Sequence, residues 1–523
     1  MKNKVQLITY VDRLGGGDVG ALHGLLTGPL KDVFGGVHLL PFFDAIDGAD
    51  AGFDPVDHTR VDPRLGQWDD VQRLAADVPV MADVIVNHMS SDSPEFRDFL
   101  ALGDQSKFAG LFLEFDTVFP SGASASDLTT LYRPRPGLPF ATFTVGGRRD
   151  GEGGGDGDGG GEGGAQRLLW TTFTAKQIDI DVSHPLGRSY LESILRTLAA
   201  AGVTMVRLDA VGYAVKRAGT DSFMTPETFA FIDEFTQSAR GYGLEVLVEV
   251  HSHFQQQIAI AERVDCVYDF ALPPLVLHAV YFKTATALAR WITIRPNNAV
   301  TVLDTHDGIG IIDIGAQNAG GSIKPGLVPP AELDALVERI HSNSDGQSRE
   351  ATGAAASNLD LYQVNCTYFD ALARDPSAYL LARAIQFFLP GIPQVYYVGL
   401  LAGCNDLALL RKTRVGRDIN RHYFTPAEID AALAEPLVQD LLTLIKLRNT
   451  HAAFDGTFAA VLLTDQVLQL TWQVEAETTQ SAEPPRAATQ LQLTADFATL
   501  NWHIKATDHG QSTTLDFIST RTA

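Results

Sequence analysis

Residues 203–211 read Val-Thr-Met-Val-Arg-Leu-Asp-Ala-Val, an apolar run that predicts a buried strand with two charged residues near its end. Strand alternation places Arg207 and Asp209 on the same face, one pleat apart. A guanidinium beside a carboxylate favours the ionised form of the acid, which a carboxylate nucleophile requires. A structural ion pair at a strand end would give the same pattern, so this stretch alone leaves both interpretations open.

Two other apolar runs also end in acids. Residues 244–251 carry Glu249 at the end of a predicted strand, and residues 300–308 lead into His306 and Asp307 before a glycine. Acids that gather at the carboxyl ends of parallel strands are typical of the active face of a (β/α)₈ barrel. The three acids together therefore favour a catalytic interpretation.

The spacing of the acids agrees with such a barrel. Asp209 and Glu249 lie 40 positions apart, one strand–helix unit at roughly 31 residues each. Glu249 and Asp307 lie 58 positions apart, which leaves room for two units, and residues 264–270 supply the intervening strand. We therefore predict an α/β fold built on a (β/α)₈ TIM barrel.

Composition limits the class of protein. The chain has 523 residues with 45% hydrophobic content, enough for a large core and a smaller one, and 40 basic against 63 acidic residues give a net charge of −23. This charge argues against a nucleic-acid or anionic-membrane partner. Only three cysteines occur, widely spaced, so neither a disulfide framework nor a zinc site is predicted.

The segments that could direct the chain to a membrane are absent from the sequence pattern. The apolar run at residues 5–11 is too short for a signal peptide, and no run of eighteen apolar residues occurs. We expect no membrane span. Together with the few cysteines, these features predict a cytoplasmic protein.

The predicted barrel is interrupted twice. Residues 5–10, 36–41 and 78–86 read as the first three strands, and the 126 positions from Asp83 to Asp209 require an inserted domain after the third. More than eighty residues also separate Asp307 from the last predicted strand, residues 391–398, so a second insertion follows strand seven.

Within these insertions and after the barrel, the pattern changes. Residues 329–342 predict a helix, and residues 378–388 predict the barrel helix that returns from the second insertion. Beyond residue 417, two helices precede segments at 467–474, 489–493 and 500–504 that alternate apolar and polar residues, which is typical of antiparallel strands. The predicted division is barrel at 1–86, 168–309 and 374–453, inserted domains at 87–167 and 310–373, and a C-terminal β-domain at 454–523.

The first insertion contains a tract of glycine and acidic residues at 151–164. Such a composition cannot bury a core and predicts a solvated loop. Glycine–aspartate repeats can bind calcium, but the tract lacks the nonapeptide period and apolar positions of that repeat. We therefore favour the loop.

The acids predict glycosidic chemistry. Two carboxyl groups that flank a bond, one ionised and one protonated, are the equipment for reaction through an oxocarbenium-like transition state. Asp209 beside Arg207 is the expected nucleophile, and the valines on either side of Glu249 favour its protonated form, as an acid/base requires. Asp307 would stabilise charge at the reacting carbon. Carboxyl groups about 5–5.5 Å apart would give retention of configuration.

The sequence also resembles a known superfamily. Residues 83–88, 206–210, 248–251 and 305–307 resemble, in order, four signature segments of the α-amylase superfamily of glycoside hydrolases, and residues 177–182 are similar to its fifth. The resemblance covers essentially the whole chain. Residues 44–54, 133–140, 357–363 and 416–422 resemble the sucrose phosphorylase family within it.

This resemblance implies roles for individual residues. It implies that Asp209 is the nucleophile, Glu249 the acid/base and Asp307 the transition-state stabiliser. Residues that would hold the glucosyl ring are Asp50, His88, Arg207, His306 and Arg417, with Phe53 as an apolar wall beside the glucose. Gln177 would also bind substrate. Residues that would form the acceptor site are Pro134, Arg135, Tyr213, Leu359, Asp360, Tyr362 and Gln363. Arg135 and Tyr362 could offer the cationic and hydroxyl donors that phosphate needs to outcompete water.

The resemblance further implies a reaction and its partners. Sucrose and inorganic phosphate would give α-D-glucose 1-phosphate and D-fructose, reversibly, in the manner of a hexosyltransferase. No metal or organic cofactor is expected, because two carboxyl groups can complete this chemistry alone. The resemblance also implies a homodimer.

Several alternatives stay open. Related phosphorylases act on glucosylglycerol, glucosylglycerate or sucrose 6′-phosphate, and Pro134 and Tyr362 argue against the last because relatives carry basic residues there. A hydrolase or transglucosidase of the same superfamily would differ only in the group that reaches the intermediate. A non-catalytic relative would have lost the acids, which this chain retains.

Overall fold

The computed structural model describes residues 3–48, 50–134, 137–146, 164–319, 322–352, 363–475, 488–508, 511–515 and 517. The chain divides into two compact units. The first comprises Met1–His38, Asp77–Pro79 and His251–Ala523, and the second comprises Leu39–Ala76 and Val80–Val250.

The parallel strands form a closed barrel in the order β1, β18, β13, β12, β11, β10, β5, β2. Their bounds are β1 (Gln6–Thr9), β2 (Gly36–Leu39), β5 (Val80–Ile85), β10 (Val203–Asp209), β11 (Glu245–Val248), β12 (Cys266–Asp269), β13 (Ala299–Thr301) and β18 (Ile392–Tyr396). The predicted eight-stranded barrel is confirmed. The predicted domain boundaries stay a prediction.

The second unit contains three neighbouring strands of this barrel. Every residue of β5 is buried, as expected of a strand covered on both faces. β10 pairs in parallel with β5 on one side and with β11 on the other. The helix before β10 is α6 (Pro185–Ala200), which buries an apolar face at Leu191, Ile194, Leu195 and Leu198.

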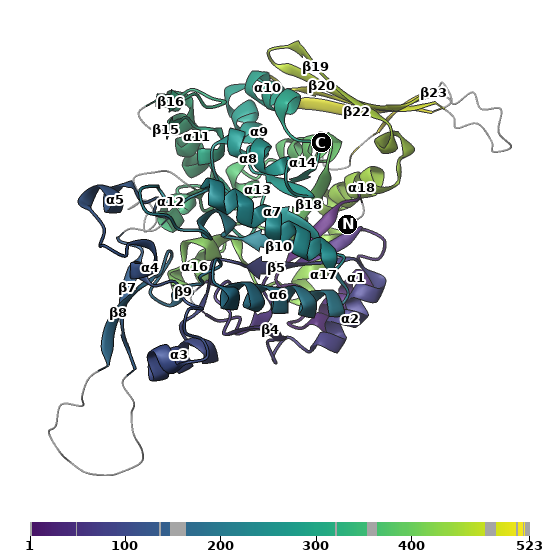
Figure 1. Ribbon diagram of the computed structural model, residues 1–523. Helices are drawn as coiled ribbons and strands as arrows, with labels where there is room; N and C mark the ends of the chain where they lie inside the picture. The colour runs from purple at the N-terminus through teal and green to yellow at the C-terminus, as the bar shows by residue number, and fades with distance from the viewer. Residues whose placement is uncertain are drawn as a thin grey trace, which may run out of the picture. The chain divides into compact units, whose positions relative to one another are not determined.

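The segment inserted after β5 has its own small core. Its strands β7 (Phe140–Val145) and β8 (Ala165–Trp170) form an antiparallel hairpin, shown in dark blue in Figure 1. Leu113, Phe119, Leu131 and Trp170 pack together beside this hairpin. Of the glycine-rich tract, residues 151–163 lie outside the described residues. The other elements here are β6 (His88–Ser90), α3 (Pro94–Leu102), η1 (Gly103–Gln105), α4 (Phe115–Val118), α5 (Ala125–Thr130) and β9 (Gln177–Asp179).

In the first unit, a second segment follows β13. Its helix α11 (Pro330–Asn343) matches the helix predicted at 329–342. The returning helix α14 (Pro376–Phe388) is also present and is buried from Ala378 to Phe388. The other elements here are β14 (Ile309–Gly310), η3 (Ile312–Ile314), β15 (Gln317–Ala319), β16 (Ser322–Lys324), α12 (Gln347–Thr352), β17 (Gln363–Val364) and α13 (Tyr368–Ala371).

One predicted strand is too long. The sequence predicts a last barrel strand over residues 391–398, but β18 ends at Tyr396 and helix α15 (Tyr397–Leu400) follows. The apolar run continues because α15 is itself buried, and the Tyr397 hydroxyl donates to the His422 carbonyl, 2.7 Å away. Apolar runs do not by themselves distinguish a buried strand from a buried helix.

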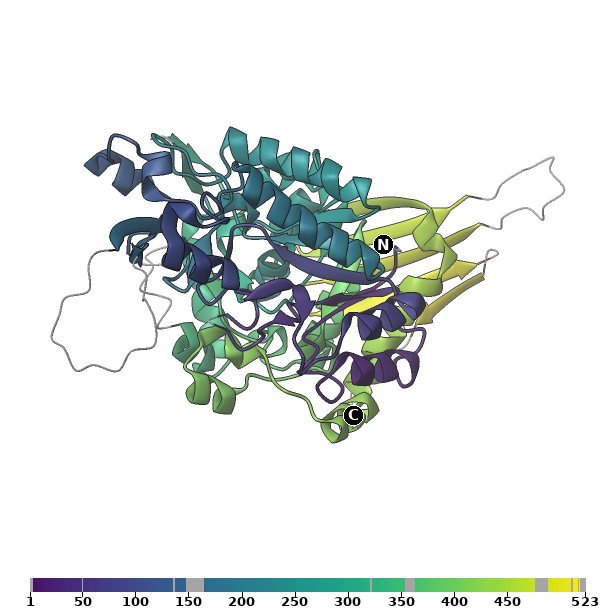
Figure 2. The ribbon, with the colours of Figure 1, turned by 60° about the horizontal axis from the view of Figure 1, so that its bottom comes forward.

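The C-terminal strands form an antiparallel sheet in the order β19 (Thr457–Thr464), β20 (Val467–Val474), β21 (Thr489–Asp496), β22 (Asn501–Asp508), β23 (Gln511–Leu515). These strands lie side by side at the yellow end of the colour scale (Figure 2). The predicted β-domain is confirmed, and its alternation buries Leu468, Leu470 and Trp472 on β20. Trp472 Nε1 donates to the carbonyl of Phe388 on α14.

Helix α18 (Pro436–Thr450) secures the first barrel strand. The Asn449 side chain accepts from the Val5 amide at 2.8 Å and donates to the Val33 carbonyl at 2.7 Å. Arg448 donates to the Asn3 carbonyl at 3.3 Å. β1 pairs on one edge with β18, where Gln6 faces Gln394. The start of β1 therefore depends on contacts from distant parts of the sequence.

The remaining helices and strands connect these parts. They are α1 (Val19–Thr27), β3 (Phe43–Asp44), β4 (Asp57–Val61), α2 (Trp68–Asp77), η2 (Val211–Tyr213), α7 (Pro226–Gly241), α8 (Phe254–Ala261), α9 (Leu272–Phe282), α10 (Thr286–Ile294), α16 (Leu407–Thr413), η4 (Gly416–Asn420), α17 (Pro426–Ala434) and η5 (Ala452–Asp455). One of the two helices predicted beyond residue 417 corresponds to α17.

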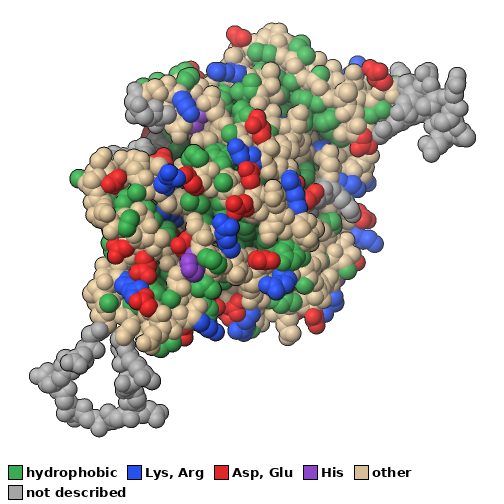
Figure 3. Space-filling model, in the orientation of Figure 1, with side chains coloured by type: hydrophobic (Ala, Val, Ile, Leu, Met, Phe, Trp, Pro, Cys, Tyr) green, Lys and Arg blue, Asp and Glu red, His purple; other side chains and the backbone are tan. Residues whose placement is uncertain are grey.

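Acidic and basic side chains are interspersed on the face that Figure 3 shows. Basic side chains form no continuous patch there among the described residues, in keeping with a net charge of −23. Throughout the described ranges, every helix is too short or too polar to span a bilayer.

Candidate active site

Arg207 on β10 is a buried cation surrounded by carboxylates. Its Nη1 lies 2.5 Å from Asp83 Oδ1 and 2.8 Å from Asp209 Oδ1, and its Nη2 lies 3.8 Å from Glu249 Oε2. The Arg207 side chain is only 2% exposed, whereas that of Asp209 is 15% exposed. The predicted pairing of Arg207 with Asp209 is confirmed, and Asp209 is the partner that solvent or a ligand can reach.

Asp83 is a residue that sequence reasoning missed as part of this group. It lies on β5 directly opposite Arg207 in the parallel register, and its side chain is fully buried. The sequence did contain an indication that Asp83 belongs to this group, because Asp83 is the first residue of the first signature segment. Its distance in sequence from Arg207 hid the pairing.

Asp209 and Glu249 follow neighbouring strands in register. Leu208 on β10 pairs with Val248 on β11, and the Glu249 amide donates to the Leu208 carbonyl at 3.3 Å. Each acid therefore comes one residue after a paired position, on strands about 4.8 Å apart. The surroundings of Glu249 differ from the apolar shell that its valine neighbours predicted, because Arg207 lies beside it.

A second set of predicted residues packs close to Arg207. The Phe53 ring lies 5.6 Å from the Arg207 guanidinium carbon, and the Phe53 carbonyl lies 2.9 Å from His88 Nε2. Gln177 Nε2 lies 3.1 Å from the same His88 nitrogen. Burial lowers the pKa of His88, which favours the neutral ring. Asp50 is partly exposed, and its amide donates to Asp54 at 3.2 Å.

Aromatic side chains continue outward from His88. Phe173 lies 5.2 Å from the His88 ring and 5.3 Å from the Tyr213 ring. Tyr132 stacks at 6.0 Å on Tyr213, and Pro134 follows in the same loop, partly exposed. Of the predicted acceptor residues in this unit, Tyr213 and Pro134 are thus placed. Arg135 lies outside the described residues.

Lys216 is a further buried cation that the sequence analysis did not single out. Its Nζ lies 2.7 Å from Asp179 Oδ2 and 2.7 Å from Asn87 Oδ1, and it donates to the Tyr213 carbonyl at 2.5 Å. Burial lowers the pKa of Lys216, while Asp179 opposes that shift. Lys216 therefore ties the ends of β6 and β9 to the turn that carries Tyr213.

In the first unit, Asp307 follows β13 and is paired with a predicted neighbour. Arg417 Nη1 lies 2.9 Å from Asp307 Oδ1, and His306 Nε2 lies 3.7 Å from Asp307 Oδ2. The Gly308 amide donates to Gln363 Oε1 at 3.3 Å. These contacts bring together four of the predicted residues. The predicted residues Leu359, Asp360 and Tyr362 lie outside the described residues.

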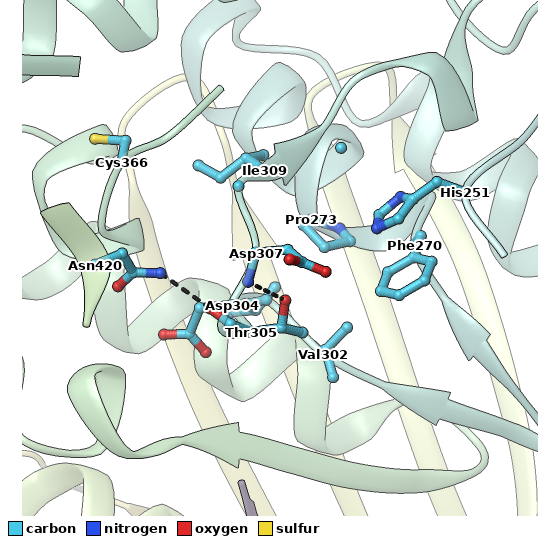
Figure 4. A pocket seen from close by; sticks show the side chains of 13 residues that line it. His251, Phe270, Pro273, Val302, Asp304, Thr305, Asp307, Ile309, Cys366 and Asn420 are labelled. Atoms are coloured by element: carbon cyan, nitrogen blue, oxygen red, sulfur yellow. Dashed lines mark hydrogen bonds between the residues drawn. The ribbon is translucent and has the colours of Figure 1, made fainter. Parts of the chain in front are cut away.

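A small pocket opens beside Asp307 (Figure 4). In the close-up, the Asp307 carboxylate points toward the rings of His251 and Phe270 on the opposite wall. The lining residues not yet named in this pocket are Pro273, Val302, Leu303, Asp304, Thr305, Ile309, Gly310, Cys366 and Asn420. The pocket combines an acid, a histidine and an aromatic ring, a mixture of polar and apolar groups that is common in small-molecule sites.

Comparison with known proteins identifies the family. No protein-family model matches the chain. A sucrose phosphorylase from Agrobacterium vitis is 58% identical over 477 residues, covering 91% of this chain and 94% of that protein. A sucrose phosphorylase from Bifidobacterium adolescentis is 51% identical over 509 residues, covering 97% of each. The chain belongs to the sucrose phosphorylase family.

A solved structure extends the comparison. The crystal structure of sucrose 6F-phosphate phosphorylase from Thermoanaerobacter thermosaccharolyticum matches with a TM-score of 0.85 and 36% identity over 99% of each chain. At lower identity, the chain is thus also similar to a protein named for a phosphorylated sugar. The resemblance to the α-amylase superfamily seen in the sequence agrees with this fold.

Proposed function

We propose that this protein catalyses the reversible phosphorolysis of sucrose to α-D-glucose 1-phosphate and D-fructose. The observation that carries the proposal is the 58% and 51% identity to two proteins named sucrose phosphorylase, over 91% and 97% of the chain. Identity to the structure named for sucrose 6F-phosphate is lower, at 36%. Unphosphorylated sucrose is therefore the favoured substrate.

In the proposed mechanism, a carboxylate oxygen of Asp209 attacks the anomeric carbon of the glucosyl unit. The bond from that carbon to the fructosyl oxygen breaks, and Glu249 gives its proton to this oxygen. Phosphate then attacks the glucosyl-enzyme, Glu249 recovers a proton from it, and Asp209 leaves as a carboxylate. Two displacements at one carbon retain its configuration.

Three observations support these roles. The Arg207 guanidinium at 2.8 Å favours the ionised form of Asp209, as a nucleophile requires. Asp209 and Glu249 follow register partners on adjacent strands, which suits the short carboxyl separation of about 5–5.5 Å in retaining enzymes. Asp307 is held by Arg417, and we propose that its carboxylate stabilises the positive charge that develops on the sugar.

The substrate contacts follow the family resemblance and are part of the proposal. We assign the glucosyl ring to Asp50, His88, Arg207, His306 and Arg417, with Phe53 as an apolar wall beside it, and we include Gln177 among the substrate-binding residues. We assign fructose or phosphate to Pro134, Arg135, Tyr213, Leu359, Asp360, Tyr362 and Gln363.

The deciding experiment is incubation with sucrose in the presence and absence of phosphate, with quantification of glucose 1-phosphate, glucose and fructose. Phosphorolysis gives glucose 1-phosphate and fructose in equal amounts and only when phosphate is present. Free glucose in place of glucose 1-phosphate would instead identify a hydrolase. Asp209→Asn serves as the control, because it keeps the shape of the side chain and removes the nucleophile.

The rival substrates are tested in the reverse direction. Glucose 1-phosphate is offered with fructose, fructose 6-phosphate, glycerol or glycerate at equal concentration. We expect fructose to be consumed with the highest kcat/KM. If the enzyme prefers glycerol, glycerate or fructose 6-phosphate as the acceptor, then its substrate is the corresponding glucoside and not sucrose.

We further propose that the enzyme acts in the cytoplasm, as a homodimer and without a metal or organic cofactor. The few cysteines and the acidic composition support the cytoplasmic location. Light scattering after size-exclusion chromatography measures the mass, which a homodimer doubles relative to the 56.5 kDa chain. Full activity after dialysis against a chelator is the expected result for catalysis by carboxyl groups alone.

A further inference from the structure

His251 is held at one ring nitrogen by a buried acid. Its Nδ1 lies 3.0 Å from Oδ2 of Asp313 on η3, and the two side chains are 3% and 0% exposed. The other carboxylate oxygen, Oδ1, accepts from the Ser252 amide at 3.2 Å and from Gln257 Nε2 at 3.0 Å. An ionised carboxylate only accepts hydrogen bonds, so His251 carries a proton on Nδ1.

The packing around this pair fixes the plane of the imidazole. The Phe270 ring stacks on His251 with centroids 3.8 Å apart and an interplanar angle of 12°. On the strand β14, a Cβ at Gly310 would lie 2.5 Å from Asp313 Oδ2 and 2.9 Å from His251 Nδ1. Glycine at this position therefore leaves room for the hydrogen bond, and any larger residue would separate its partners.

The His251 ring also borders the pocket beside Asp307. His251 and Phe270 line this pocket with Asp307 (Figure 4), and a ring nitrogen of His251 lies within 4.8 Å of a carboxylate oxygen of Asp307. Because Nδ1 faces Asp313, Nε2 is the nitrogen on the other side of the ring. An imidazole with Nδ1 protonated offers a lone pair at Nε2.

We propose that Asp313 is a positioning residue, which fixes the tautomer and orientation of His251 so that Nε2 meets a hydroxyl of the sugar bound beside Asp307. The inference rests on the proposed function for the identity of the ligand. Asp313 does not touch the ligand itself. It acts through His251, in the way that a second carboxylate commonly orients a functional histidine.

Asp313→Asn tests the inference because it reverses the tautomer. Ser252 and Gln257 both donate to one oxygen of residue 313, so they retain the amide oxygen of asparagine on their side. The amide NH₂ then points at Nδ1 and requires an acceptor there, which moves the ring proton to Nε2. We expect kcat/KM for sucrose to fall about 10- to 100-fold while the far-UV spectrum and the unfolding midpoint stay close to those of the wild type.

A control variant changes a histidine–carboxylate pair in which the histidine is buried and the acid is partly exposed. His278 Nε2 lies 2.7 Å from Glu332 Oε2 in the same unit, and neither residue lines the pocket. Glu332→Gln should leave kcat/KM within about twofold of the wild type, as expected for a partly exposed pair. An equal loss in Glu332→Gln and Asp313→Asn would overturn the positioning role.

Two further variants distinguish positioning from general damage. Gly310→Ala separates Asp313 from His251 without changing charge, and it should reproduce the kinetic defect of Asp313→Asn. In His251→Gln, the addition of Asp313→Asn should cost less than about twofold, because the residue through which Asp313 acts is already gone. A further tenfold loss in the double variant would contradict the inference.

The tautomer itself can be measured on the resting enzyme. Protein labelled with ¹⁵N-histidine gives separate signals for protonated and unprotonated ring nitrogens, and comparison with His251→Gln assigns the pair that belongs to residue 251. We expect a protonated Nδ1 in the wild type. An unprotonated Nδ1 would reject the role of Asp313 even if sucrose phosphorolysis is found, whereas absence of phosphorolysis with a protonated Nδ1 would reject only the proposed substrate.

Discussion

The guanidinium of Arg207 lies 2.8 Å from the carboxylate of Asp209, two residues further along the same strand. The same buried group also faces Asp83 and Glu249, so one cation serves three acids. Asp209 is the most exposed of the three. The arrangement places a positive charge beside the carboxylate that a ligand can reach, as our proposed nucleophile requires, while the fully buried Asp83 contacts the same guanidinium.

Asp83→Asn should destabilise the protein because it leaves Arg207 buried with one charged partner fewer. We expect the free energy of unfolding in urea to fall by about 3 kcal/mol, the cost of removing one partner from a buried ion pair. Asp47→Asn removes an acid from the exposed pair with Arg64 and should cost less than about 1 kcal/mol. Similar losses in both variants would show that Asp83 has no special role.

Lys216→Met should also destabilise the protein, because it leaves a buried acid without a cation. The fully buried Asp179 would lose its ammonium partner. We expect a loss of about 3–5 kcal/mol in the free energy of unfolding. Lys176→Met, at an exposed position of the same unit, is the control and should change stability by no more than about 0.5 kcal/mol. Denaturation of both variants in urea gives the comparison, and an unchanged midpoint for Lys216→Met would contradict the expectation.

Arg417→Lys should weaken catalysis more than folding. A lysine at this position keeps the positive charge but loses the planar guanidinium that lies 2.9 Å from Asp307. We expect kcat/KM for sucrose to fall about 10- to 100-fold. Arg411→Lys alters an exposed arginine that pairs with Glu350 and should keep wild-type kinetics. Wild-type activity in Arg417→Lys would show that the Arg417 guanidinium is not required at the active site.

The burial of His58 should make the stability of the protein depend on pH. Burial lowers the pKa of His58 to about 4, and its ordinary value is 6.5. Between these values the unfolded chain binds the proton and the folded chain does not, so stability is lost as pH falls from 6.5 to 4. The shift corresponds to about 3 kcal/mol.

Urea denaturation across this pH range measures the effect. His58→Gln removes the titrating group, so its stability should decline less steeply than that of the wild type between pH 6.5 and 4. His503→Gln, at an exposed position of β22, should keep the wild-type slope. Parallel profiles for His58→Gln and the wild type would show that another group causes the loss.

Local patterns in the sequence were enough to predict the barrel and the acids at its strand ends. The strands β5 and β10 are buried and parallel, so they read as continuous apolar runs. In the C-terminal sheet, β20 to β22 alternate because one face is buried. The edge strand β19 was missed, since most of its side chains are exposed and no alternation marks it.

Contacts between distant residues could not be predicted from local patterns. Lys216 sits 129 positions from Asn87, and Asp313 sits 62 positions from His251. In the sequence each of these residues is an ordinary polar residue near a turn. Only the fold shows that they are buried against one another, and for that reason the sequence did not predict these contacts, whereas the acids that follow apolar runs could be proposed from local patterns.

The contacts between helix α18 and the residues at the start of strand β1 affect how the chain folds during synthesis. Val5 and Asn449 are 444 positions apart, and β1 also needs β18 as its partner. Ribosomes add about 5–20 residues each second, so the first strand emerges tens of seconds before the residues that hold it. We expect nascent chains released before residue 390 to be cleaved readily by proteases and to engage chaperones, because an unpaired strand edge invites aggregation.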